Sequence, residues 1–150
     1  MKIKILPVIQ MLIAMIAMLI IEAMISIGYF DWGWNILLSV AMVVMGVMLV
    51  LMGGVAFKKA NTTVNPMCPE NSSALVTNGI YRFSRNPMYL GGLLMLLAWG
   101  LFLGSMPSFI MLPIFCWYIT RSQIHAEEQA LENKFGERYR MYKLKVRRWI

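Results

Sequence analysis

The stretch ILLSVAMVVMGVMLVLMGGVAFKK, residues 36–59, decides the class of this protein. No charged residue interrupts it before Lys58 and Lys59, which end the apolar run. Because an α-helix rises about 1.5 Å per residue and the hydrocarbon core of a bilayer is about 30 Å thick, the run is long enough to cross a membrane. The composition agrees, since 59% of the residues are hydrophobic and 14% are charged, whereas soluble domains carry about 25% charged residues. The sequence therefore predicts an integral membrane protein.

Three further apolar runs predict additional membrane helices. The first covers residues 5–27 and is interrupted by Glu22, which lies near the outer end of the run, where its side chain can reach water. Two shorter runs, residues 88–103 and 108–120, are separated by the turn sequence GSMPS and predict a helical hairpin. The second helix of the hairpin is expected to continue beyond the bilayer and to end at Gly136. We therefore expect an all-α integral membrane protein with four transmembrane helices, the last two a hairpin, and a cytoplasmic helical C-terminal extension.

Charge placement predicts the orientation of these helices. With the N-terminus inside, four spans place all 14 lysines and arginines on the inner side and none in the two outer turns, as the positive-inside rule requires. A two-span or six-span arrangement also keeps both ends inside, but it fits the apolar runs less well. We expect both termini in the cytoplasm and the prokaryotic inner (plasma) membrane as the location. The chain is expected to form a single membrane domain, residues 1–150, made of two N-terminal spans at 1–57, a cytoplasmic loop at 58–87, and the hairpin with the C-terminal helix at 88–150.

The net charge of +7 does not indicate a nucleic-acid partner. The basic residues flank apolar runs instead of covering one soluble face, which fits contact with a bilayer that contains anionic lipid. The chain has two cysteines and one histidine. Cys116 lies within an apolar run, Cys68 lies in the polar loop, and His125 has no second His or Cys near it in sequence. No bound metal is therefore expected.

Polar residues gather at the expected cytoplasmic ends of the helices. They lie in LVTNGIYRFSRNPMYLGG (residues 75–92), RSQIHAEEQ (residues 121–129) and FGERYRMYK (residues 135–143). Pro87 suits the first turn of a helix, where free N–H groups and the positive end of the dipole attract a carboxylate. This convergence predicts a pocket that is reached from both lipid and cytosol. The alternative is a helix start that serves packing alone.

The acidic stretch HAEEQALENKF, residues 125–135, predicts different surroundings for its two adjacent glutamates. Residues four apart share one face of an α-helix, so Gln123 and Glu127 point one way and Glu128 points another. One carboxylate can then face a ligand while the other meets water or a basic residue. The alternative is a solvated, charged helix without a pocket.

Two stretches carry a family resemblance. LVTNGIYRFSRNPMYLGG and EEQALENKFGERYRMYK (residues 127–143), with the hydrophobic hairpin between them, resemble the isoprenylcysteine carboxyl methyltransferase family, which is related to membrane phospholipid methyltransferases. The resemblance covers residues 72–148 and implies S-adenosyl-L-methionine (SAM) as methyl donor, bound at the cytoplasmic face. The cofactor-binding residues that it implies are Ser73, Ala74, Leu75, Val76, Tyr81, Asn86, Pro87, Met88, Tyr89 and Glu127.

The acceptor implied by the resemblance is lipid-like or prenylated and offers a carboxylate, thiol or amine at the cytoplasmic leaflet. Arg85 and Arg121 are candidates to position an anionic acceptor group, or else to anchor their helices at lipid headgroups. Two departures from the family pattern bear on the acceptor: the family usually has His where this chain has Asn86, and prenylcysteine enzymes have Arg where it has Gln123. Asn86 does not titrate near neutral pH, so proton transfer is not expected there. The identity of the acceptor and the oligomeric state are left open.

Two other functions remain as alternatives. A nicotinamide-dependent membrane reductase of related architecture would share the C-terminal half, although the sequence has no dinucleotide fingerprint. A non-catalytic small membrane assembly protein would tolerate alanine in RNPMY, residues 85–89, and at Glu127 and Glu128.

Overall fold

The computed structural model of the chain describes residues 6–25, 27–31, 33–62 and 73–150. Over these residues the chain is helical, with one isolated bridge between Tyr29 and Ser105 and no strand. The all-α class predicted from the sequence is therefore confirmed. Cys68 and part of the predicted cytoplasmic loop lie outside the described residues.

The elements in chain order are α1 (Pro7–Met24), α2 (Asn35–Lys59), the 3-10 helix η2 (Gly79–Arg82), α3 (Pro87–Leu103), the 3-10 helix η3 (Pro107–Ile110), α4 (Met111–Ile119), the π-helical turn η4 (Thr120–Ile124), α5 (His125–Phe135) and α6 (Glu137–Lys145).

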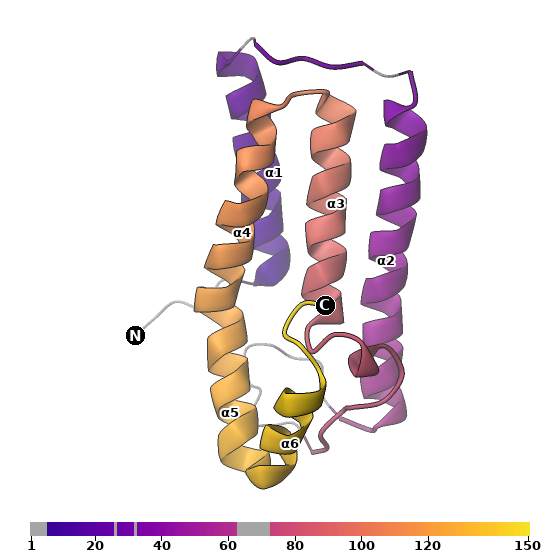
Figure 1. Ribbon diagram of the computed structural model, residues 1–150, viewed down its shortest axis with the longest axis vertical. Coiled ribbons are helices and arrows are strands. Elements are labelled where there is room, and N and C mark those ends of the chain that lie inside the picture. Colours follow the sequence, from indigo (N-terminus) through magenta and orange to yellow (C-terminus); the bar gives the residue numbers. More distant parts are fainter. Residues whose placement is uncertain (1–5, 26, 32, 63–72) are drawn as a thin grey trace.

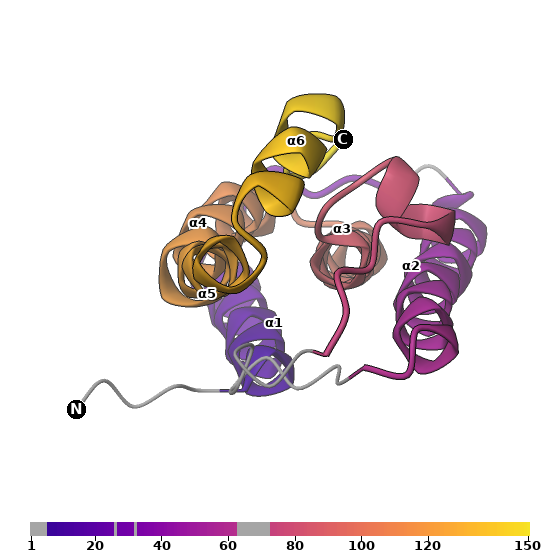
Figure 2. The same ribbon diagram turned by 90° about the horizontal axis from the view of Figure 1, so that it is seen from below.

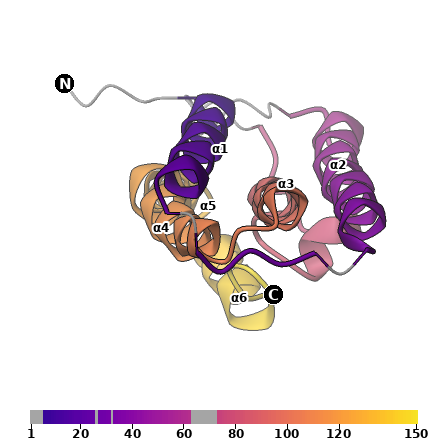
Figure 3. The ribbon, with the colours of Figure 1, turned by 90° about the horizontal axis from the view of Figure 1, so that it is seen from above.

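Helix α3 occupies the middle of the bundle (Figure 1; Figure 3). It packs against α2 on one side and against α1 and α4 on the other. Helix α4 passes through η4 directly into α5, which continues its line beyond the start of α3, and α6 then turns back along α5 (Figure 1). Seen from below, α6 and α1 lie on opposite sides of the column formed by α4 and α5 (Figure 2).

Among the described residues, two helices are long and apolar enough to cross a membrane, α1 with 18 residues and α2 with 25 residues. Helix α3 is a shorter apolar helix of 17 residues, and α4 has 9 residues before the π-helical turn. Both long helices expose large apolar side chains, such as Val8 (62% exposed) and Ile36 (68% exposed). An apolar outer surface of this extent fits lipid as the surrounding solvent, while the number of four spans stays a prediction.

Glycines bring the backbones of α2 and α3 into contact. A Cβ atom on Gly46 would lie 2.7 Å from the carbonyl oxygen of Gly91, and a Cβ atom on Gly91 would lie 2.5 Å from the carbonyl oxygen of Gly46. No side chain fits at these distances, so both positions require glycine. Ser39, Gly46 and Gly53 are the buried residues of α2, and they recur every seven residues, or about two helical turns. This contact fixes α3 against α2.

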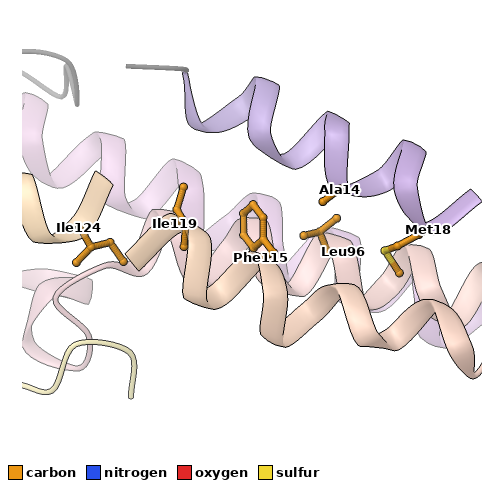
Figure 4. Packing of buried hydrophobic residues seen from close by; sticks show 6 residues of the cluster. All are labelled: Ala14, Met18, Leu96, Phe115, Ile119 and Ile124. Carbon is orange, nitrogen blue, oxygen red and sulfur yellow. The ribbon is translucent and has the colours of Figure 1, made fainter. Parts of the chain in front are cut away.

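The buried core lies between α1, α3 and the column of α4 and α5 (Figure 4). It consists of Ala14, Met18, Leu96, Phe115, Ile119 and Ile124. Two hydrogen bonds tie the helices together near this core. The indole N–H of Trp99 donates to the carbonyl of Met15 (3.2 Å), and the hydroxyl of Ser108 donates to the carbonyl of Met18 (3.0 Å). The core and these bonds together set the position of α4, and therefore of α5, relative to α3.

Candidate active site

A cavity of about 390 Å³ opens where α5 and α6 meet the start of α3. Small-molecule sites usually measure about 300–1,000 Å³, so its size suits a ligand. Part of its wall is apolar and comes from the beginning of α1, with Leu6, Val8 and Met11, and from Val50 of α2. The rest of the wall carries polar and aromatic groups, among them Tyr81, Arg85, Asn86, Tyr89, Glu127, Glu128, Tyr139 and Tyr142.

Most residues predicted to bind a cofactor line this cavity. They are Ala74, Leu75, Val76, Tyr81, Asn86, Met88, Tyr89 and Glu127. Ser73 instead joins its segment to the end of α2, because its N–H donates to Oγ1 of Thr62 (2.8 Å) and its hydroxyl donates to the carbonyl of Asn61 (2.9 Å). Pro87 is the buried first residue of α3 and does not line the cavity. The binding role of each residue stays a prediction.

A hydrogen bond at the cavity wall joins α3 to α5. The hydroxyl of Tyr89, in the first turn of α3, donates to Oε1 of Glu127, in the first turn of α5. Pro87 starts α3 because its missing N–H would have no partner at that position, and Gly91 holds the same turn against α2. The phenol and the carboxylate thus meet at one point, where they can hold an amine or a hydroxyl of a ligand.

Glu128 points to different partners, two arginines. Its Oε1 accepts a hydrogen bond from Nε of Arg148 (3.0 Å), and its Oε2 accepts one from Nη2 of the same residue (2.7 Å). Nη1 of Arg85 lies 3.2 Å from Oε1. Burial alone would raise the pKa of the Glu128 carboxyl, but the hydrogen bonds from Arg148 and the positive charges nearby, that of Arg85 first, outweigh burial, so the pKa lies below its ordinary value. Glu128 is therefore an anchor for arginines, whereas Glu127 meets Tyr89.

Arg85 has N–H groups that are not used within the described part of the chain. Its side chain is 10% exposed and lines the cavity. Nη1 lies within ion-pair distance of Glu128 without hydrogen-bond geometry, and neither Nη1 nor Nε has a hydrogen-bond partner among the described residues. Buried N–H groups without acceptors cost free energy, which a ligand with acceptor atoms would recover. Because Arg85 and Arg148 share one carboxylate, this end of the cavity suits an anionic group.

The C-terminal segment covers the start of α3. The backbone N–H of Arg85 donates to the carbonyl of Arg147 (3.1 Å), and Nδ2 of Asn86 donates to the carbonyl of Arg148 (3.0 Å). Trp149 packs against the buried core. The amide of Asn86 is therefore a hydrogen-bond donor within the wall of the cavity.

Tyrosines from two elements complete the wall. The hydroxyl of Tyr142 donates to the carbonyl of Tyr81 (2.7 Å), and the ring of Tyr81 meets that of Phe57 edge to face, with 5.4 Å between centroids. Burial raises the pKa of Tyr81 and that of Tyr142 above the ordinary value. Burial, and after it the charge of Glu128, raise the pKa of Tyr139 to about 12. These phenols stay protonated at neutral pH and act as hydrogen-bond donors.

Parts of the wall that were not predicted from the sequence include Tyr139, Tyr142, Val50 and the beginning of α1, and the pairing of Arg148 with Glu128 beside the cavity was not predicted either. The two tyrosines do carry a signal, because they lie three residues apart in FGERYRMYK and so share one face of a helix. No comparable signal marks Leu6 or Met11 within a uniformly apolar run.

The structure does not bring Arg121 to the cavity. Its guanidinium lies over the ring of Trp117, 5.8 Å from the centroid, and it lines a separate polar hollow of about 500 Å³ together with His125. Gln123, the position at which prenylcysteine enzymes carry Arg, is 2% exposed within the π-helical turn η4. Of the two arginines considered for the acceptor, Arg85 is the one that meets the cavity.

The groups on the wall fit the predicted cofactor. A carboxylate paired with a phenol suits an amino group or ribose hydroxyls, and the unused N–H groups of the Arg85 guanidinium suit an anionic group of either the cofactor or the acceptor. Aromatic and aliphatic side chains suit the adenine ring. No group of three or more His, Cys, Asp or Glu residues placed to hold a metal occurs in the described ranges.

Comparison with known proteins relates the chain to methyltransferases. The sequence model of the phospholipid methyltransferase family matches residues 34–138. An uncharacterized protein of Haemophilus influenzae is 52% identical over 63 residues, which are 42% of this chain and 100% of that protein. The protein-S-isoprenylcysteine O-methyltransferase of Schizosaccharomyces pombe is 35% identical over 72 residues, which are 48% of this chain but 30% of the yeast protein. No solved structure matches the chain.

These matches confirm the family resemblance that rests on residues 75–92 and 127–143, and they do not favour the reductase alternative. The family match runs from the residue before α2 into α6. It therefore includes Arg85, Tyr89 and Glu127 on the polar part of the cavity wall. Because the match covers well over half of the chain, the protein belongs to the phospholipid methyltransferase family.

Proposed function

We propose that the protein is an integral membrane methyltransferase that uses SAM and acts on a lipid-like or prenylated acceptor at the cytoplasmic leaflet. The observation that supports this most is the cavity, which combines polar groups at Arg85, Tyr89 and Glu127 with an apolar wall from α1 and α2. A polar methyl donor and a lipophilic acceptor must meet in one site. A cavity with both a polar and an apolar wall can bind these two molecules side by side.

The polar part of the wall would hold the cofactor. The free N–H groups at the start of α3 would bind its carboxylate. Glu127, together with Tyr89, would bind its amino group or the ribose hydroxyls. Tyr81, Leu75 and Val76 would lie against the adenine ring, because an aromatic ring and aliphatic side chains offer it an apolar surface.

The apolar part of the wall would admit the acceptor from the lipid. Leu6, Val8 and Met11 lie at the beginning of α1 and Val50 lies in α2, and α3 lies between these two helices (Figure 3). Because both helices expose apolar side chains, an acyl or prenyl chain could pass between them and stay in apolar surroundings. Arg85 would then meet an anionic group at the head of the acceptor.

The cofactor, when bound, supplies a methyl carbon on a sulfonium sulfur, and this sulfur keeps the bonding electron pair when the methyl group moves to the acceptor. The chain must bring the two reactants into line and exclude water, which is a matter of proximity and orientation. A carboxylate or thiolate acceptor needs no base, whereas an amine must arrive unprotonated. The protonated phenols of Tyr81 and Tyr139 would orient the reactants as donors and would not remove a proton.

We place the protein in the membrane as a single domain with four spans, formed by α1, α2, α3 and α4. Both termini and the loop at residues 58–87 then lie in the cytoplasm, and α5 and α6 extend from a prokaryotic inner membrane into it. Single cysteines introduced at Asp31 and at Glu137, in a chain that carries Cys68→Ser and Cys116→Ser, test this placement. They should react with an impermeant label from opposite sides of sealed vesicles, and labelling of both from one side would reject it.

Titration calorimetry tests cofactor binding. Purified protein should bind SAM, and Glu127→Ala should bind it more weakly. Glu137→Ala is the matched control, because the Glu137 side chain is 75% exposed and lies outside the cavity. Absence of binding to the wild type, or equal binding to Glu127→Ala, would reject the proposal. Incubation of membranes with a labelled methyl donor would then show which lipid fraction gains label and so identify the acceptor.

A further inference from the structure

Helix α6 has two faces of different character. The face toward the bundle buries Tyr139 (2% exposed), Tyr142 (8%) and Val146 just beyond the helix (8%). The opposite face exposes Met141 at 47% and Leu144 at 82%. Leu144 is the most exposed of the large hydrophobic residues described for this chain. A large apolar side chain left this open on an ordered helix indicates a surface that something else covers.

Basic residues flank this apolar pair. Successive residues of an α-helix are about 100° apart around the axis, so Met141 and Leu144 lie at the centre of the outward face. Arg140 lies on one side of the pair, where it also pairs with Glu132 (3.0 Å) and Glu137 (3.7 Å), and Arg138 with Lys145 lies on the other, all of them exposed. We call Met141, Leu144, Arg138, Arg140 and Lys145 the outer face of α6. The exposed Glu137, seven residues before Leu144, ends this side of the helix farther from α3. An apolar centre with basic flanks is the pattern of helices that lie in the interface of an anionic membrane.

The outer face lies close to the level at which the apolar part of the bundle begins. Helix α6 runs back toward the start of α3 (Figure 1). The carbonyls of Arg147 and Arg148, just beyond α6, accept hydrogen bonds from Arg85 and Asn86, just before α3. The last turn of α6, with Leu144, is therefore held within a few residues of the first apolar turn of α3.

Neighbouring segments continue this apolar surface. Phe83 is 74% exposed and Ile150 is 77% exposed, and they lie on the two segments that meet where the hydroxyl of Ser84 donates to the carbonyl of Arg148 (3.5 Å). The exposed apolar surface of the transmembrane helices is thus followed, at their cytoplasmic end, by a smaller apolar surface surrounded by basic side chains.

We propose that the outer face of α6 docks on the anionic surface of the inner leaflet. Met141 and Leu144 enter the boundary between headgroups and acyl chains, and Arg138, Arg140 and Lys145 contact lipid phosphates. The bilayer is the occupant because the face joins the apolar surface of the bundle and has the charge that attracts anionic lipid. The inference rests on the membrane placement proposed above.

Docking of α6 has a consequence for the cavity. The inward face of the same helix supplies Tyr139 and Tyr142 to the cavity wall, and the segment after it supplies Arg148 to Glu128. A membrane that holds the outer face in place therefore also holds one wall of the cavity in place.

An environment-sensitive fluorophore tests the docking directly. Leu144→Cys is labelled in the full-length chain with Cys68→Ser and Cys116→Ser, and the protein is placed in nanodiscs of phosphatidylcholine with or without phosphatidylglycerol. Glu137→Cys is the matched control, because position 137 is seven residues earlier on the same side of α6 and farther from α3. The probe at position 144 should shift to shorter wavelength and be quenched by spin-labelled lipid, more strongly with phosphatidylglycerol. The probe at 137 should stay water-like.

Several results would overturn the inference. Equal, water-like emission at positions 144 and 137 in both kinds of nanodisc would show that α6 stays in water. If the probe at position 144 becomes less exposed to water as the protein concentration rises, and not as the lipid charge rises, the outer face binds a protein partner instead. Adding Arg138→Glu and Lys145→Glu should abolish the effect of phosphatidylglycerol, and an unchanged effect would reject the role of charge. Failure of the wild-type chain to enter nanodiscs would reject the membrane placement itself, and the docking with it.

Discussion

The hydroxyl of Tyr89 donates a hydrogen bond to the carboxylate of Glu127, 38 residues later in the chain, and both side chains line the cavity. The bond joins the first turn of α3 to the first turn of α5. Two polar motifs that are separated by a hydrophobic hairpin in the sequence thereby become one candidate site.

Replacing Tyr89 by Phe should weaken cofactor binding while the fold stays intact. The ring remains in place, but the site loses the hydroxyl that, together with Glu127, is proposed to hold the amino group or the ribose hydroxyls of the cofactor. A hydrogen bond to a charged group contributes about 1.5–3 kcal/mol, so the Kd for SAM in calorimetry should rise about 10- to 100-fold. Tyr118→Phe, at a position that is 41% exposed on α4, should bind as the wild type does. An unchanged Kd for Tyr89→Phe would show that this pair does not hold the cofactor.

Replacing Gly91 by Ala should destabilise the bundle through the contact between α2 and α3. The new Cβ atom would lie 2.5 Å from the carbonyl oxygen of Gly46 and 2.9 Å from Cγ2 of Val50, and overpacking of this kind costs about 1–3 kcal/mol. The midpoint of thermal unfolding in detergent should fall. Gly54→Ala is the control on α2, since nothing lies within 4 Å of its added Cβ atom. Equal midpoints for the two variants would contradict the close contact.

Replacing Glu128 by Gln should lower stability at neutral pH. The substitution leaves Arg85 and Arg148 without their shared carboxylate, and removal of one partner from a buried ion pair costs about 3–5 kcal/mol. Because Arg148 is 32% exposed, water offsets part of this cost, and we expect the lower end of that range. Unfolding in detergent measures the loss, and Glu137→Gln, at an exposed position, should be close to the wild type.

The same carboxyl should make stability depend on pH. Its pKa is lower in the folded protein than its ordinary value, so its stabilising contribution is fully present above the unfolded pKa of about 4.3 and is lost as the pH falls through the lower, folded pKa. The wild type should therefore lose stability on acidification by more than Glu128→Gln does. The unfolding midpoints of the wild type and of Glu128→Gln, measured from neutral to acidic pH, test this. If the two midpoints fall in parallel as the pH falls, Glu128 is not the group responsible.

Much of the fold is predictable from the sequence because it depends on long apolar runs and strong end signals. The run at residues 36–57 lies within α2, and the helix that begins at Met111 continues through η4 to Phe135. It ends at Gly136, whose φ of 53° few other residues adopt. Signals of this kind are local, so a single stretch of sequence contains them.

The candidate site is predictable only in part. Asn86 lies directly before α3 and Glu127 follows the apolar run of α4, and polar groups next to apolar runs stand out in a sequence. Met11 reaches the cavity, and Arg148 reaches Glu128 on its wall, through packing between distant segments, which no short-range spacing encodes. It is also difficult to predict which side chains of α5 face the cavity. The π-helical turn η4 has a wider i→i+5 hydrogen-bond pattern, so it rotates the side chains of α5 around the helix axis relative to those of α4.

The last prediction separates binding of the acceptor from binding of the cofactor. Arg85→Lys keeps the positive charge beside Glu128 but removes the planar fork, whose Nε and Nη1 have no hydrogen-bond partner in the described chain. If Arg85 holds an anionic group of the acceptor, the KM for the acceptor should rise about tenfold or more, as expected for a lost charge-assisted hydrogen bond, while the Kd for SAM changes little. Arg121→Lys, at the separate polar hollow, should leave both constants unchanged. A rise in the Kd for SAM without a change in acceptor KM would instead assign Arg85 to the cofactor carboxylate, because that group is the other anion that this end of the cavity would meet.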